Sequence, residues 1–238
     1  PYGAVHLRER IAERYTARGV PTHADQIIVT SGAVMAISVA LHTLVRPGER
    51  VVVDSPTYPG ALSAIATVRA RAVPVALDTG WDLDAWAVAV RRARPRVAYL
   101  VPDFHNPTGL LMPTAQREEL ARLLREAGCV TVIDETVAEL DFGEAGPERP
   151  FAAVDDDVVC IGSTSKVLWG GFRIGWLRCP EQHVDAFRRQ AGSLSLGPSA
   201  LDQLVVTTFL ENPAPVRDAV VDRLRRARTA WQTSLADR

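Results

Sequence analysis

The chain alternates short apolar runs with segments in which apolar residues recur at three- and four-residue spacing. The short runs predict seven strands, and the periodic segments between most of them predict helices. The predicted strands are Ile27 to Thr30, Arg50 to Val53, Ala72 to Ala76, Arg96 to Val101, Val130 to Asp134, Val158 to Ile161 and Ile174 to Arg178. The predicted helices include Leu7 to Arg18, Ala33 to Val45, Tyr58 to Val68, Leu83 to Ala93 and Thr114 to Ala127.

This order of elements predicts an α/β fold, a three-layer sandwich around a mostly parallel seven-stranded sheet. The segment from Ile174 to Arg178 follows the preceding strand without an intervening helix. We therefore expect that one strand to be antiparallel. Gly143 to Pro150 is the segment expected to be loose.

The stretch from Pro215 to Arg238 is predicted to be one amphipathic helix. Its apolar residues at helical spacing are Val216, Val220, Leu224, Ala227, Trp231 and Leu235. Its arginines could form a nucleic-acid-binding face, but Asp218 and Asp222 lie among them and favour a solvated helix face.

Composition narrows the class of protein. A chain of 238 residues that is 47% hydrophobic can bury a large core, and its net charge of −1 gives no electrostatic case for binding nucleic acid. Cys129, Cys160 and Cys179 are odd in number and lack metal-ligand spacing, which is typical of reduced core cysteines in a cytoplasmic protein. No apolar run reaches membrane-spanning length. We expect a cytoplasmic domain without a metal or a membrane span.

The segment from Gly162 to Trp176 carries the strongest chemical signal. It places Lys166 beside Ser163 and Ser165, and Arg173 follows seven residues later. Because a lysine and an arginine in an apolar, glycine-rich stretch are costly to bury without partners, the pattern indicates a phosphate held beside a reactive amine. A phosphorylated aldehyde would satisfy the set, with the lysine condensing with the aldehyde. The alternative is a polar loop with a solvated lysine.

Two predicted strands end in polar residues that extend this interpretation. Asn106 follows the strand ending at Val101, and Asp134 closes the strand that begins at Val130. Ligands of open α/β sheets bind at the carboxyl ends of the strands. There an aspartate can pair with a protonated pyridine nitrogen, and an asparagine amide can donate to a ring oxygen. For each residue alone, a helix cap or a turn former is the alternative.

Taken together, these motifs resemble the large domain of the fold-type I pyridoxal-phosphate aminotransferases, class I/II. The resemblance runs from about Tyr2 to the end of the chain. It rests on Asp134, on the sequence HNPTG from His105, and on GSTSK ending at Lys166 with the later Arg173. The wording PDFHNPTG with SKVLWGGFRIGWLR is most similar to the aminotransferase-like domain of MocR-branch GntR-type regulators. There the domain follows a winged-helix DNA-binding module.

The resemblance implies pyridoxal 5′-phosphate as the cofactor and a role for each site residue. Lys166 would form the internal aldimine, Asp134 would face the pyridine nitrogen, and Asn106 would face the ring 3-oxygen. The phosphate would be bound by Ser163, Ser165, Arg173 and the backbone amides of Gly32, Ala33 and Val34 at a helix N-terminus. An ordinary helix capped by Ser31 is the alternative there. Tyr58 would stack on the cofactor ring, with a core or turn tyrosine as its alternative.

Two departures from the family pattern concern this site. Val34 and Met35 stand where the family usually carries glutamines, so a phosphate contact there must come from the backbone. The tyrosine that usually follows the strand-end aspartate is absent, and Thr136 is the shorter donor left beside Val137. Cofactor binding is therefore better supported than efficient transamination.

The resemblance implies transamination between an amino acid and a 2-oxo acid through Lys166. The alternative is the effector-sensing domain of a MocR/GntR-type regulator using the same site, and a third class is a phosphate-binding domain without cofactor. The resemblance also implies a homodimer, with Tyr2 and Gly3 near the partner's cofactor. Residues 1–238 would be the large domain. A small C-terminal domain with the substrate-carboxylate arginine, and any N-terminal winged helix, would lie outside this chain.

Overall fold

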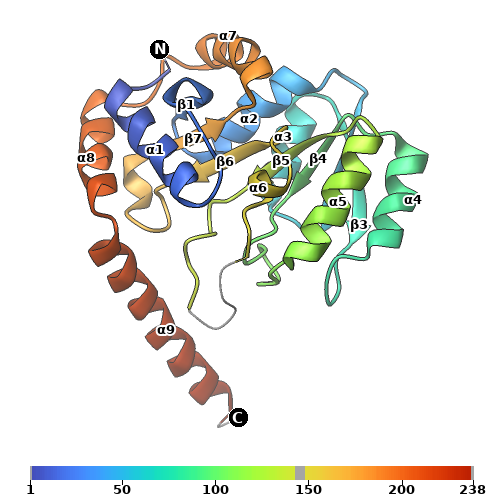
Figure 1. Ribbon diagram of the computed structural model, residues 1–238. Coiled ribbons are helices and arrows are strands. Elements are labelled where there is room, and N and C mark those ends of the chain that lie inside the picture. Colours follow the sequence, from blue (N-terminus) through green and yellow to red (C-terminus); the bar gives the residue numbers. More distant parts are fainter. Residues whose placement is uncertain (1, 143–147, 237–238) are drawn as a thin grey trace.

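The fold is built on a seven-stranded sheet, seen in a computed structural model that describes residues 2–142 and 148–236 (Figure 1). The strand order is β1-β7-β6-β5-β4-β2-β3, and β7 alone runs antiparallel to both of its neighbours. The strands are β1 (Ile27–Thr30), β2 (Arg50–Ser55), β3 (Arg71–Ala76), β4 (Val97–Leu100), β5 (Val130–Asp134), β6 (Val159–Ser163) and β7 (Gly175–Arg178). The predicted mostly parallel sheet and its antiparallel strand are thereby confirmed.

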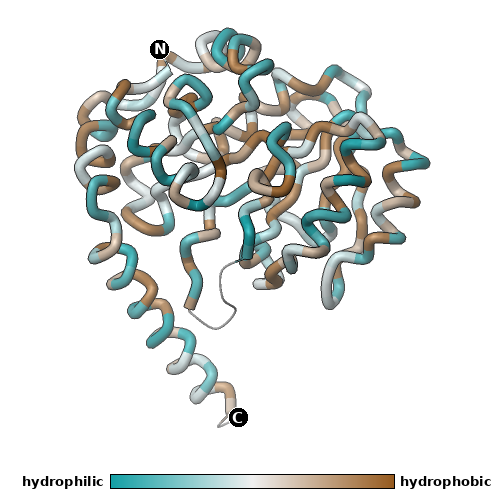
Figure 2. The backbone as a smooth tube through the Cα atoms, in the orientation of Figure 1, coloured by the Kyte–Doolittle hydropathy of each residue, from teal (hydrophilic) through white to brown (hydrophobic). Residues whose placement is uncertain are grey.

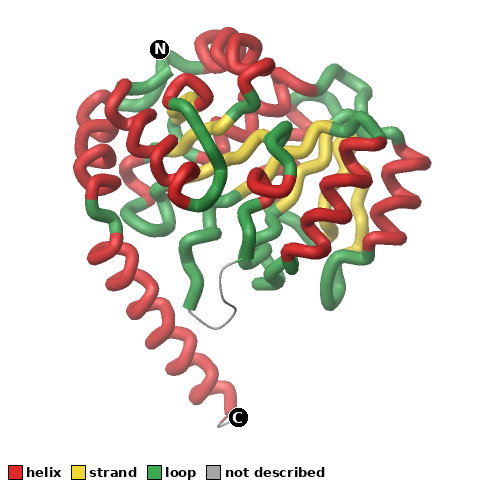
Figure 3. The backbone as a smooth tube through the Cα atoms, viewed as in Figure 1, coloured by secondary structure: helices red, strands yellow, loops and turns green. Residues whose placement is uncertain are grey.

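Helices cover both faces of the sheet and give three layers (Figure 3). One face carries α2 (Ala33–Leu44), α3 (Pro59–Thr67) and α7 (Val184–Leu194). The other carries α1 (Val5–Ala17), α4 (Leu83–Ala93), α5 (Thr114–Glu126) and the short α6 (Phe151–Val154), and α8 (Ala200–Glu211) packs on α1. The helix α9 (Ala214–Ala236) extends away from this body (Figure 1).

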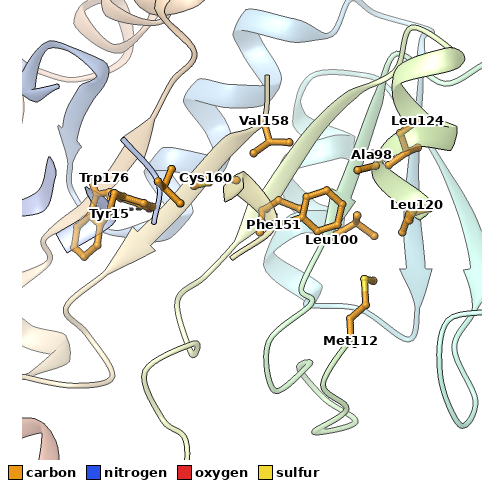
Figure 4. Close-up of a cluster of buried hydrophobic side chains, with 14 of the residues drawn as sticks. Tyr15, Ala98, Leu100, Met112, Leu120, Leu124, Phe151, Val158, Cys160 and Trp176 are labelled. Carbon is orange, nitrogen blue, oxygen red and sulfur yellow. Dashed lines mark hydrogen bonds between the residues drawn. The ribbon is translucent and has the colours of Figure 1, made fainter. Parts of the chain in front are cut away.

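The core follows from the alternation of side chains along the strands. In β4, Ala98 and Leu100 join the buried cluster beneath α5 and α6, where Phe151 and Leu120 pack (Figure 4). Val97 and Tyr99 point to the opposite cluster beneath α2 and α3. Because both faces are covered, all four residues of β4 are buried, and the apolar residues concentrate between the layers (Figure 2).

Three features differ from the prediction or extend it. No helix is predicted between the last strand and Pro215, whereas α7 and α8 lie there. The predicted C-terminal helix is present as α9, but its apolar stripe is not packed, since Trp231 is 70% exposed and Val221 is its one buried residue. Of the segment from 143 to 150 predicted to be loose, residues 143–147 lie outside the described residues, and α6 begins directly after 150.

The order of the strands fixes the place of the site. The chain runs from β2 outward to β3 and then returns to β4 on the other side of β2. Crossovers that diverge in this way leave a crevice at the carboxyl ends of the strands. Tyr58 follows β2, Asn106 follows β4, Asp134 ends β5 and Ser163 ends β6.

Candidate functional site

One pocket at the carboxyl edge of the sheet gathers nearly all of the predicted residues. It is lined by Ala33, Val34, Tyr58, Val101, Asn106, Asp134, Thr136, Val137, Ser163, Ser165, Lys166 and Arg173. Gly32 borders it, because a Cβ atom added to Gly32 would lie 2.7 Å from Nη2 of Arg173. Val101 and Val137 complete the lining as apolar wall residues, which the sequence analysis did not assign to the site.

One end of the pocket presents hydrogen-bond donors from two directions. Arg173 has a left-handed backbone (φ 47°), and its guanidinium lies against the Gly32 turn, with Nη1 donating to the Gly170 carbonyl at 3.4 Å. The hydroxyls of Ser163 and Ser165 are 2.9 Å apart. This concentration of donors and positive charge suits a phosphate dianion.

The helix N-terminus at this end is open. α2 begins at Ala33 with Gly32 as its N-cap, and no side chain caps it. The alternative in which Ser31 caps this helix is therefore wrong. Gly32 has φ 92°, a backbone conformation that favours glycine, and uncapped amides of a helix N-terminus bind anions.

Lys166 lies between the two ends of the pocket. Its side chain is exposed, and among the described residues its ammonium group has no hydrogen-bond or ion-pair partner. The lysine amine is thus available to a molecule in the pocket.

The other end of the pocket centres on the buried carboxylate of Asp134. One of its oxygens, Oδ1, accepts from the Thr136 amide at 2.9 Å, and Oδ2 accepts from the Tyr99 hydroxyl at 2.7 Å. Burial raises the pKa of Tyr99, and the nearby Asp134 carboxylate raises it further, so the phenol stays a donor. Two donors fix the plane of the carboxylate and leave acceptor capacity directed at the pocket.

Tyr99 is a residue that the sequence analysis missed. It lies in the middle of a strand whose apolar run accounts for it as a core residue. The available signal was that a fully buried tyrosine hydroxyl needs a hydrogen-bond partner. Naming that partner requires the β4–β5 register, in which Tyr99 pairs with Val132, two residues before Asp134.

Thr136 and Tyr58 lie beside this carboxylate. The Thr136 hydroxyl is buried, and among the described residues it has no hydrogen-bond partner. A buried unpaired hydroxyl is costly, and an acceptor in the pocket would satisfy it. Tyr58 is half-buried and its ring lies over Gly60, where a Cβ atom would be 2.4 Å from the ring.

Glu135, the acid after Asp134, points away from the pocket into a buried network. Oε2 accepts from the Tyr15 hydroxyl at 2.8 Å, which in turn accepts from Trp176 Nε1 at 3.2 Å, and Arg18 lies 3.3 Å from Oε1. Burial raises the pKa of Glu135, and Arg18 opposes that shift. The network joins α1, β5 and β7 and braces the strand end that carries Asp134.

The model of the family described as aminotransferase class I and II matches residues 1–236, and the chain belongs to that family. The uncharacterized HTH-type transcriptional regulator YdcR of Escherichia coli is 33% identical, with 99% of this chain and 51% of the regulator covered. The arginine–pyruvate transaminase AruH of Pseudomonas aeruginosa is 31% identical over 97% of this chain and 60% of its own length.

A solved aminotransferase structure has a similar fold. The α-aminoadipate aminotransferase LysN of Thermus thermophilus, complexed with N-(5′-phosphopyridoxyl)-L-leucine, superposes with a TM-score of 0.84 and is 28% identical. The match covers 94% of this chain and 57% of LysN. The chain spans about half to three fifths of the length of these relatives.

The pocket residues fit a pyridoxal phosphate group. The unpaired amine of Lys166 suits an aldehyde, and the fixed carboxylate of Asp134 suits a pyridine nitrogen. The unpaired, buried hydroxyl of Thr136 suits a ring oxygen, and the arginine beside the open helix N-terminus suits a phosphate. Within the described residues no helix is long and apolar enough to cross a membrane, and no three His, Cys, Asp or Glu side chains are grouped as metal ligands would be.

Proposed function

We propose that this chain binds pyridoxal 5′-phosphate in the pocket at the carboxyl edge of the sheet and transfers an amino group between an amino acid and a 2-oxo acid. The observation that carries the proposal is the convergence of Lys166, Asp134 and Arg173, from three segments, on one pocket. Phosphate binding without a cofactor would explain Arg173, but it would explain neither the fixed Asp134 carboxylate nor the unpaired lysine.

Each residue has a task in holding the cofactor. Ser163, Ser165, Arg173 and the amides of Gly32, Ala33 and Val34 would bind the phosphate. Tyr58 would cover one face of the ring. The remaining two, Asn106 and Thr136, would donate to the ring 3-oxygen.

The chemistry divides between cofactor and chain. When bound, the cofactor supplies an electron-withdrawing ring that stabilises negative charge at the substrate α-carbon. Asp134, oriented by the Tyr99 hydroxyl, would keep the ring nitrogen protonated. Lys166 would hold the aldehyde carbon, and its amine, when free, would carry a proton to and from the substrate α-carbon.

A second candidate is an effector-sensing domain of a DNA-binding regulator. The observation in its favour is the similarity to YdcR, which extends over 99% of this chain. The pocket serves both functions, since either requires the cofactor and an incoming amine. A winged helix encoded ahead of residue 1 would favour the regulator, and repeated turnover of amino acid with 2-oxo acid would favour the enzyme.

The test loads the protein with pyridoxal phosphate and mixes it with single amino acids while the visible absorbance is recorded. Transamination predicts loss of the visible band with amino donors and its return on adding a 2-oxo acid. A sensor predicts a spectral shift with bound amino acid and no 2-oxo acid product. A protein that develops no visible band with the cofactor would contradict both.

We also infer a cytoplasmic homodimer. Leu196, Leu201 and Leu204, between the end of α7 and the middle of α8, are 97%, 68% and 64% exposed. Exposed large apolar side chains this close in sequence support association with a partner surface. The early segment lies against the same helix, since the Ala4 amide donates to Gln203 Oε1 at 2.7 Å. Sedimentation velocity of the loaded protein should show a dimer, and an active monomer would contradict it.

A further inference from the structure

A second buried polar cluster lies behind the turn that carries Asn106. It consists of Asp54 at the end of β2, His105 just before Asn106, Thr108 in the turn, and Trp81 ahead of α4. The side chains of Asp54 and His105 are completely buried. His105 begins the HNPTG motif, but neither residue was assigned a role from the sequence, and neither lines the cofactor pocket.

His105 joins the turn to the cluster. Its backbone amide donates to the Leu110 carbonyl at 2.8 Å, and its carbonyl accepts from the Gly109 amide at 2.6 Å, which closes the turn around Asn106. Its ring Nδ1 is 2.9 Å from the Thr108 hydroxyl, and that oxygen accepts from the Leu110 amide at 3.4 Å. The ring therefore adds a side-chain contact to a turn that backbone hydrogen bonds close.

The other ring nitrogen faces Asp54. The distance from Nε2 to Asp54 Oδ2 is 3.6 Å, longer than a hydrogen bond, and neither atom has another hydrogen-bond partner within the described residues. Buried polar atoms without partners are costly. A proton between Nε2 and Oδ2 would give both atoms a hydrogen-bond partner once the distance between them shortened slightly.

A hydrogen bond to its other oxygen, Oδ1, holds Asp54 in place. Trp81 Nε1 donates to Oδ1 at 2.9 Å, and the Trp81 ring meets the His105 ring edge-on, with 6.0 Å between centroids. The neighbouring ionisable group is Tyr99, whose pKa is raised partly by Asp54. Burial raises the pKa of Asp54 to about 7, against the hydrogen bonds from Trp81 and the Val101 amide.

We propose that Asp54 and His105 share a proton and act as a relay that positions Asn106 toward the ring oxygen of the cofactor. With Asp54 ionised, His105 carries its proton on Nε2, and Nδ1 accepts from the Thr108 hydroxyl. In this tautomer the Thr108 hydroxyl donates to Nδ1 while its oxygen accepts from the Leu110 amide, so all three groups of the turn are bonded. With the proton on Nδ1 instead, the ring would donate to Thr108 and the hydroxyl hydrogen would lose this acceptor. The bonding in the turn thus depends on which His105 nitrogen faces the carboxylate in β2. Asp54 and His105 are positioning residues, since they touch the turn and not the pocket.

The inference rests on the proposed function, because Asn106 matters only if the pocket holds the cofactor. The main test is a double-mutant cycle on the dissociation constant for pyridoxal phosphate, with Asp54→Asn and Asn106→Ala. If Asp54 acts through Asn106, Asp54→Asn should weaken binding about fivefold in the natural chain and less than about twofold once Asn106 is gone. Equal weakening in both backgrounds would overturn the relay.

The controls separate positioning from loss of the fold. Asp84→Asn, an exposed carboxylate in the first turn of α4, should leave cofactor affinity unchanged. His105→Gln takes the place of Asp54→Asn in the same cycle if the latter does not fold, and the same non-additive result is expected.

A second measurement needs no cofactor. Imidazole ¹H–¹⁵N spectra of the cofactor-free protein at pH 8, with His105 assigned through His105→Gln, should show the proton on Nε2. In Asp54→Asn, Trp81 keeps the amide oxygen and turns the NH₂ group toward His105, so the proton should move to Nδ1. An unchanged tautomer would overturn the relay. Absence of cofactor binding to the natural chain, with the tautomer change present, would instead reject the proposed function.

Discussion

The two ends of the pocket are built in different ways. The phosphate end takes the side chains of Ser163, Ser165 and Arg173 from one stretch of chain, in which they bond to one another or to nearby backbone, and adds the Gly32 turn ahead of α2. The ring end takes Asp134, whose oriented oxygen is fixed by Tyr99, 35 residues earlier in the sequence. The Asn106 turn is backed by Asp54 from a third strand.

The difference separates what a local motif can build from what the sheet must build. A phosphate needs donors and positive charge, and the stretch from Ser163 to Arg173 supplies most of the side-chain donors from neighbouring residues, with the α2 N-terminus brought to it by the pairing of β1 with β7. A ring nitrogen and a ring oxygen need a carboxylate and an amide at set angles, and only the register of parallel strands sets these. Changes at the phosphate end should therefore alter affinity, whereas changes at the ring end should alter chemistry.

The largest effect is expected at the ring end. Asp134→Asn keeps the size of the side chain and its hydrogen bond to the Thr136 amide, but a neutral amide does not hold the ring nitrogen protonated. Transamination should fall about 100- to 1,000-fold, with cofactor affinity much less affected. Steady-state kinetics and cofactor titration measure the two. Undiminished turnover would remove Asp134 from the site.

At the phosphate end, Arg173→Ala removes a charged donor beside the Gly32 turn. Affinity for pyridoxal phosphate should fall by about 100-fold, the equivalent of one or two charged hydrogen bonds. Unphosphorylated pyridoxal is the matched control, and its affinity should not change. A loss of the same size for both ligands would mean that Arg173 acts on the fold rather than on the phosphate.

The buried Asp54 makes the stability of the folded protein sensitive to pH. Its folded pKa of about 7 lies above the usual 3.8, so the folded state binds this proton more tightly than the unfolded chain does. The stability that the proton contributes is complete below pH 4 and is lost as the pH rises through 7. Between pH 5 and 8 the loss amounts to about 2–3 kcal/mol.

The measurement is urea unfolding of the natural chain and of Asp54→Asn across this pH range. The difference in unfolding free energy between the two proteins should change by that amount. At high pH, Asp54→Asn should become more stable relative to the natural chain. A difference that is constant with pH would show that Asp54 does not titrate in this window.

The smallest effect concerns the donor to the ring oxygen. Val137→Tyr introduces the phenol that the family usually carries near this position, beside the unpaired Thr136 hydroxyl. A charge-assisted hydrogen bond contributes about 1.5–3 kcal/mol, so the pH midpoint of the visible absorbance should fall by about one to two units. A spectroscopic titration of both proteins checks this. Equal midpoints would indicate that another group already supplies the donor.

The sequence predicted the sheet and the pocket lining but not what supports the lining. The seven strands could be predicted because parallel strands buried on both faces are continuous apolar runs. The site residues could be predicted because motifs placed them at strand ends. Tyr99 and Asp54 could not, since their partners are set by strand register and by the packing of the turn. The α9 helix could be predicted from its periodicity, but periodicity does not show what covers an apolar face, and this one is largely exposed.

The most direct test of the account is the identity of the residue bonded to the cofactor. The protein is loaded with pyridoxal phosphate, reduced with borohydride, digested and analysed by mass spectrometry, with Lys166→Ala treated in parallel. The account predicts a phosphopyridoxyl group on Lys166 and, in the variant, loss of both the visible band and the reducible bond. A reduced adduct on another residue, or a visible band that persists in Lys166→Ala, would contradict it.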